Sequence, residues 1–134
     1  MSEISNDTGF DPRMMLTCRE AMDYTLAEQV QRWRGLLGMH GERDARFRLA
    51  EVAWVSAMNQ TTHAYAMASA TRALLQGASI PAIVAALGVA DVEAFRRMWQ
   101  PWAQAQPLLF IQGHGAVSPQ DCARVGRLLA KAQL

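Results

Sequence analysis

The chain has 134 residues, of which 51% are hydrophobic and 19% charged, with a formal net charge of +1 at pH 7. These proportions are typical of a globular protein rather than a disordered one. No apolar stretch approaches the roughly 20 residues needed to span a bilayer, and the first residues lack the pattern of a secretion signal. Cys18 and Cys122 are far apart and are expected as free thiols. The sequence therefore favours a cytoplasmic protein with no membrane partner.

Basic residues are concentrated in the second half of the chain, although the total charge is nearly balanced. From residue 52 onward the basic residues are Arg72, Arg96, Arg97, Arg124, Arg127 and Lys131. Only three carboxylates, those of Asp91, Glu93 and Asp121, oppose them. An excess of positive charge is what attracts the phosphates of nucleic acids. The second half is therefore the better candidate for binding a polyanion.

Abundant alanine, with few Val, Ile and Thr residues, favours helices along most of the chain. We expect an all-α fold, a compact bundle of five to six helices. Residues 1–10 are polar and are predicted to be a flexible N-terminus, and residues 11–134 are predicted to form a single helical domain. A first helix is predicted from residue 11 to about residue 24.

Two further helices are predicted before Gly77. Thr25 and Glu28 form a capping box that begins a helix ending at Leu37. Its buried stripe is predicted to be Leu26, Val30, Trp33 and Leu37. Residues 44–76 contain no glycine or proline, which predicts one long helix in which large residues recur every seven positions with small residues between them. This helix is either the centre of the bundle or, in part, a surface that pairs with its copy in a dimer.

Residues 79–100 have the pattern of two short helices joined by a sharp turn. Ser79 can cap the first helix, in which Ile83 and Leu87 lie one turn apart on an inward face. Gly88 follows where the chain must leave the helix in a conformation that glycine adopts most easily. Asp91 can cap the second helix, whose apolar residues point back at the first. Those residues are Phe95, Met98, Trp99 and Trp102. This pattern predicts a helix-turn-helix.

The last part of the chain, residues 107–133, is predicted to be an arm followed by a helix. Residues 107–111 are apolar and are interpreted as an extended arm packed on the core or on a second subunit. Ser118 and Pro119 begin the last helix by the same cap-then-proline signal as Ser79. Its inner face is predicted to be Val125, Leu128 and Leu129.

The run Ile83-Val-Ala-Ala-Leu-Gly-Val89, between Ser79 and a second capped helix, resembles the helix-turn-helix of bacterial transcription regulators, especially small ones from actinobacteria. The resemblance covers about a sixth of the chain and implies a dimeric regulator that binds double-stranded DNA sequence-specifically, with the second helix in the major groove. The residues expected at the DNA are Arg72, Ser79, Val92, Glu93, Arg96, Arg97 and Gln100. Among them Arg96, Arg97 and Gln100 would face bases or phosphates, and Arg72 and Ser79 would hold the backbone.

Other functions remain open on the sequence. The same residues would also suit an ordinary helical hairpin, or one through which an adaptor binds another protein. An enzyme is not expected, because no CxxC, HxxxH or HExxH spacing is present. The pair of His114 and Cys122 lacks a third group that would activate a nucleophile. No cofactor is expected, and no small-molecule effector is identified.

Overall fold

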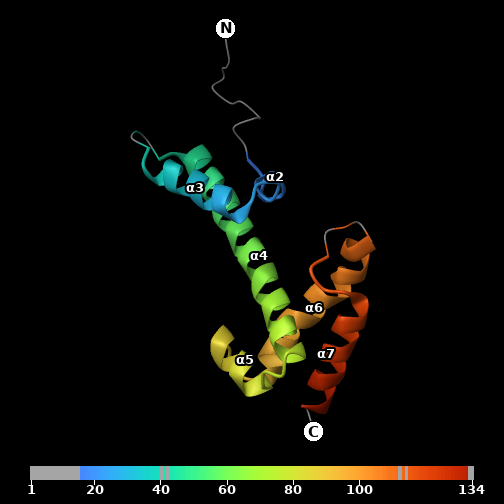
Figure 1. Ribbon diagram of the computed structural model, residues 1–134. Helices are drawn as coiled ribbons and strands as arrows, with labels where there is room; N and C mark the ends of the chain where they lie inside the picture. The colour runs from blue at the N-terminus through green and yellow to red at the C-terminus, as the bar shows by residue number, and fades with distance from the viewer. Residues whose placement is uncertain (1–15, 40, 42, 112, 114, 133–134) are drawn as a thin grey trace. The chain divides into compact units, whose positions relative to one another are not determined.

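The computed structural model describes residues 16–132 apart from residues 40, 42, 112 and 114. Within this part of the chain it contains six α-helices and no strand (Figure 1). The predicted all-α fold of five to six helices is confirmed. The predicted flexible stretch 1–10 lies outside the described residues. Contacts divide the chain into two compact units, residues 1–62 and 63–134, and the single domain over 11–134 stays a prediction.

Unit 1 contains α2 (Cys18–Ala21), α3 (Leu26–Leu37) and the first part of α4 (Ala45–Leu75). Both short helices begin with a capping box, in which a threonine hydroxyl accepts from the third helical amide and a glutamate reaches back to the threonine amide. The box at Thr25 was predicted. A second box at Thr17 begins α2 at Cys18. Of the first predicted helix, residues 11–15 lie outside the described part, and within that part the helix covers Cys18–Ala21.

The core of unit 1 differs from the predicted one. Tyr24 and Trp54 meet edge to face with their ring centroids 5.4 Å apart. The residue of α3 that is fully buried is Gln29. Its Nε2 donates to the Tyr24 carbonyl at 2.9 Å and to the Thr61 hydroxyl at 3.2 Å. The predicted stripe was wrong about Leu37, which is exposed, because α4 packs on the side of α3 that presents Gln29.

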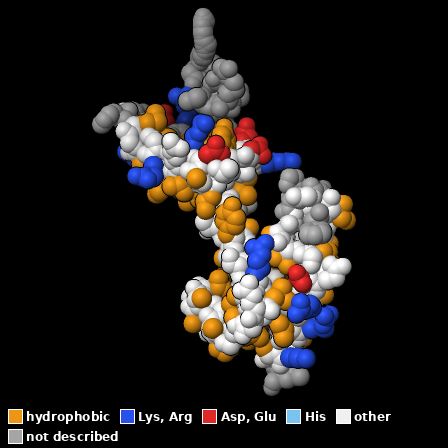
Figure 2. Space-filling model, viewed as in Figure 1, with side chains coloured by type: hydrophobic (Ala, Val, Ile, Leu, Met, Phe, Trp, Pro, Cys, Tyr) orange, Lys and Arg blue, Asp and Glu red, His pale blue; other side chains and the backbone are white. Residues whose placement is uncertain are grey.

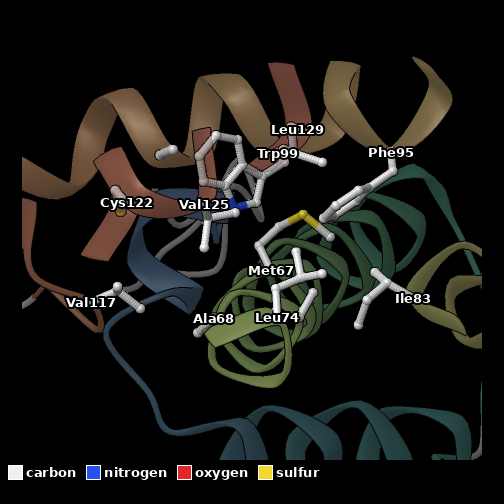
Figure 3. Packing of buried hydrophobic residues seen from close by; sticks show 12 residues of the cluster. Met67, Ala68, Leu74, Ile83, Phe95, Trp99, Val117, Cys122, Val125 and Leu129 are labelled. Carbon is white, nitrogen blue, oxygen red and sulfur yellow. The ribbon is translucent and has the colours of Figure 1, made fainter. Parts of the chain in front are cut away.

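Unit 2 contains the last part of α4 together with α5 (Ile80–Leu87), α6 (Val92–Ile111) and α7 (Pro119–Lys131). Phe95 and Trp99 lie against Met67 from α4 in a core that also includes residues from α5 and α7 (Figure 3). The indole Nε1 of Trp99 donates to the Thr71 hydroxyl at 2.9 Å, so the one polar atom of this side chain has a partner inside the core. The predicted inward faces of residues 79–100 are confirmed.

Residues 107–111 are not an extended arm. They form the last turns of α6, which continues through Pro101 and Pro107. A proline within a helix removes one backbone hydrogen bond, and the neighbouring Gln106 is buried. The side-chain oxygen of Gln106 accepts from the Ala116 amide at 3.0 Å and so fixes the chain after the helix. Tertiary contacts here override a local signal.

The last helix follows its predicted start. Ser118 caps α7 through the Asp121 amide, and Pro119 occupies the first turn. Val125 and Leu129 are buried as predicted. Leu128 is 40% exposed, so its assignment to the inner face was wrong, since α7 turns Cys122 rather than Leu128 towards the core.

Candidate nucleic-acid interface

The turn between α5 and α6 depends on Gly88. Its backbone is left-handed, with φ 72° and ψ 27°, a region that costs a residue with a Cβ atom about 1–2 kcal/mol. The amides of Gly88 and Val89 donate to the Val84 carbonyl at 3.1 and 3.3 Å. At the other end of α5 the Ser79 hydroxyl accepts from the Ala82 amide at 3.2 Å. Local sequence therefore determines both ends of α5.

Asp91 begins α6. Its carboxylate accepts from the Ala94 amide at 2.8 Å, as a helix cap does. Four residues, 88–91, separate the two helices, which is the turn length of a helix-turn-helix. Residues 79–100 therefore contain two capped helices joined by a tight glycine turn.

The first half of α6 exposes fewer predicted contact residues than the sequence suggested. Glu93, Arg97 and Gln100 are exposed. Within the described residues Arg97 has no hydrogen-bond or ion-pair partner. Val92 is half-buried and packs against the core of unit 2. The outward face near the start of α6 is therefore Glu93, Arg97 and Gln100.

Arg96 was predicted to be exposed, and that was wrong. It is only 7% exposed. Its Nη2 donates to the Leu129 carbonyl in α7 at 2.9 Å, and its Nη1 forms an ion pair with Glu93. Residues three apart share a helix face, so Arg96 lies on the same side as Trp99, which packs against Gly126 of α7. Arg96 therefore connects α6 to α7 through a hydrogen bond.

Two other predicted contacts already have partners within unit 2. Arg72 Nη2 donates to the Ala116 carbonyl at 2.6 Å, which fixes the chain just before α7. The Ser79 hydroxyl caps α5. Both residues are exposed, so they remain accessible to solvent despite these hydrogen bonds. Their prediction as backbone contacts stays a prediction.

The structure adds a basic surface that was not among the predicted contacts. Arg124, Arg127 and Lys131 project from one face of α7 around the exposed Leu128 and line a shallow hollow of about 230 Å³. Figure 2 shows Lys and Arg side chains gathered along this helix. Their spacing of three and four residues could have indicated a shared helix face. We refer to these three residues as the α7 basic face.

Cys122 is buried in unit 2. Burial, with a smaller effect of the Asp121 carboxylate, raises the pKa of the Cys122 thiol, which is the opposite of what a nucleophile needs. His114, the other member of the pair considered from the sequence, lies outside the described residues. Across those residues no group of three His, Cys, Asp or Glu side chains could hold a metal ion. None of the described helices is long and apolar enough to cross a membrane.

Comparison of the chain with protein-family models, with curated proteins and with solved structures gives no match.

Proposed function

We propose that the chain is a dimeric, cytoplasmic transcription regulator that binds double-stranded DNA sequence-specifically through α5 and α6. The observation that supports this most is the four-residue turn at Gly88 between two capped helices, with a polar outward face at the start of the second helix. In a helix-turn-helix the early residues of the second helix contact base edges in the major groove. In α6 those residues are Glu93, Arg97 and Gln100.

Each of these side chains has a suitable base partner. A guanidinium such as that of Arg97 donates to O6 and N7 of guanine, and an amide such as that of Gln100 pairs with N6 and N7 of adenine. Glu93 can accept from N4 of cytosine, although its ion pair with Arg96 holds it near the helix. A good two-point pairing contributes about 1–3 kcal/mol of discrimination against a wrong base. Arg97 and Gln100 are therefore the proposed base-reading residues.

Dimerisation is part of the proposal, because two copies would read half-sites about 34 Å apart. Within unit 1, α4 exposes an apolar face at Leu49, Val52 and Val55, which follow one another at three-residue spacing. Val52 is 59% exposed. Covering such a face with a second copy removes apolar area from water, which favours association. Val52→Asp should therefore lower the molar mass measured by light scattering from that of a dimer to that of a monomer, whereas a monomeric wild type would contradict dimerisation.

Charge reversal at Arg97 tests the proposed interface. Arg97→Glu should reduce affinity for the preferred duplex at least tenfold, because it replaces a donor at the groove with a group that phosphate repels. Arg97 is exposed and unpartnered in the described structure, so helicity measured by circular dichroism should not change. Arg34→Glu, an exposed arginine of unit 1, is the matched control and should bind as the wild type does. Equal affinities of both variants would exclude α6 as the reading helix.

The second candidate function is that of a helical adaptor that binds another protein through the same hairpin. Apolar exposure further along α6, beyond the hairpin, would extend such a binding surface, since Leu108 is 63% exposed and Ile111 is 84% exposed. The two functions differ in their response to salt. DNA binding through several phosphates weakens steeply as salt rises, whereas burial of apolar side chains against a protein changes little.

A further inference from the structure

The α7 basic face is short of counter-charges. Arg124 has one carboxylate nearby, that of Asp121, with 3.7 Å between Nη1 and Oδ1. Arg127 and Lys131 have no ion-pair or hydrogen-bond partner among the described residues. All three basic side chains are exposed. Three cations thus stand on about two turns of helix, or roughly 10 Å at 1.5 Å per residue.

The outward face of α6, by contrast, cannot attract DNA by charge. Its first turn carries Asp91 and Glu93, and the nearby Arg96 is buried and paired. Arg97 is then the one basic residue among 91–100 that is exposed. Within residues 91–100 two carboxylates balance two guanidinium groups, so this segment has no net charge to attract phosphate. Since neutralised phosphates supply much of the affinity of DNA-binding proteins, DNA binding through α6 needs positive charge from another part of the chain.

Contacts between α6 and α7 show which parts of the two helices lie at the same level along their axes. Arg96 contacts Leu129, Trp99 contacts Gly126, and Gln106 contacts Ala116. As the residue number rises on α6 it falls on the other segment, so α6 and α7 run antiparallel. Lys131 is two residues from Leu129, and Arg97 is next to Arg96. The last turn of α7 therefore lies level with the start of α6.

We propose that the α7 basic face binds the phosphate backbone of the duplex whose groove α6 enters. This inference rests on the proposed function and names the element that supplies its electrostatic part. B-DNA carries one negative charge per about 1.7 Å of axis, so a segment as long as the basic face presents several phosphates to it. A lipid surface fits less well, because the apolar face of α7, with Cys122, Val125 and Leu129, is buried in the core, whereas a membrane-binding helix inserts that face.

The test is the salt dependence of binding to a fluorescent duplex, measured by anisotropy with the full chain. Each neutralised phosphate contributes about 0.9 to the slope of log K against log salt. The double variant Arg127→Gln with Lys131→Gln should therefore reduce that slope by about 1.8 and weaken binding about 60-fold at about 0.1 M salt. Arg19→Gln with Arg34→Gln is the matched control, since both are exposed arginines of unit 1, and it should keep the wild-type slope.

The outcomes separate this inference from the proposed function. If the wild type binds DNA and the α7 variant keeps its full slope, the basic face is not a phosphate contact, while DNA binding through α6 stands. If the wild type binds no duplex at any salt concentration, both proposals are overturned. Binding to vesicles containing anionic lipid, without binding to duplex, would also overturn the assignment to DNA. Circular dichroism confirms that each variant is folded, as expected for substitutions at exposed positions.

Discussion

Arg96 and Arg97 are adjacent arginines for which the structure implies opposite roles. Arg96 is buried and donates to the Leu129 carbonyl at 2.9 Å, whereas Arg97 is exposed and unpartnered among the described residues. Replacing Arg96 by methionine keeps much of the apolar stem but removes the guanidinium. The Leu129 carbonyl then loses its side-chain donor, and Glu93 loses its ion pair.

The cost follows from these two lost contacts. A hydrogen bond to a charged group contributes about 1.5–3 kcal/mol, and the pair with Glu93 adds little because the Glu93 side chain is 51% exposed. Arg96→Met should therefore lower the free energy of unfolding by about 2–3 kcal/mol. Arg97→Met, a change at an exposed site, should stay within about 0.5 kcal/mol of the wild type.

Urea denaturation followed by circular dichroism measures both variants, with the free energy taken by linear extrapolation. DNA affinity, measured on the folded proteins, should show the reverse order, with Arg97→Met the weaker binder. Equal stability of the Arg96→Met variant and the wild type would refute the link between α6 and α7. If that variant were stable and also failed to bind DNA, Arg96 would be a DNA contact, as the sequence alone suggested.

Three further outcomes are expected. Thr71→Val should lower the free energy of unfolding, measured by urea denaturation, by about 1–3 kcal/mol, because the buried Trp99 indole loses its acceptor. Thr71→Ser, which keeps the hydroxyl, should retain most of the wild-type free energy of unfolding. Bonds from Thr25 lower the pKa of Glu28, so its contribution to stability is present above the ordinary carboxyl pKa and is lost as pH falls through the lowered value. Between about pH 6 and about pH 3 the free energy of unfolding should therefore fall less steeply in Glu28→Gln than in the wild type. The same pH dependence in both proteins would contradict this. Burial raises the pKa of Cys122, so this thiol should react slowly with maleimide in the folded protein. In the Cys18→Ser variant at about pH 8, labelling of the folded protein should be at least about tenfold slower than labelling of the denatured protein. Equal rates would show that the thiol is accessible.

The features predicted correctly from the sequence are those that depend on neighbouring residues. Thr25, Ser79, Asp91 and Ser118 all act as caps in the structure, because a cap needs only the amides two or three residues further on. The glycine turn at residue 88 is equally local. These signals were sufficient to predict an all-helical chain with a tight turn between α5 and α6.

The features that the sequence did not reveal depend on distant partners. The burial of Arg96 follows from α7, 33 residues away along the chain, and that of Gln29 follows from Thr61, 32 residues away. The apolar run at residues 107–111 predicted an extended arm, whereas these residues continue α6, and Gln106 accepts from the distant Ala116 amide. The spacing of Glu93 and Arg96 was the one local hint, since opposite charges three residues apart on a helix can pair.

Binding of the purified wild type to duplex DNA tests the central claim most directly. Fluorescence anisotropy would compare a random-sequence duplex with the DNA upstream of the gene, each at a low and a high salt concentration. We expect binding that weakens steeply with salt and is tighter for the upstream DNA. No binding to either duplex at low salt would contradict the account and leave the α5–α6 hairpin as a protein-binding element.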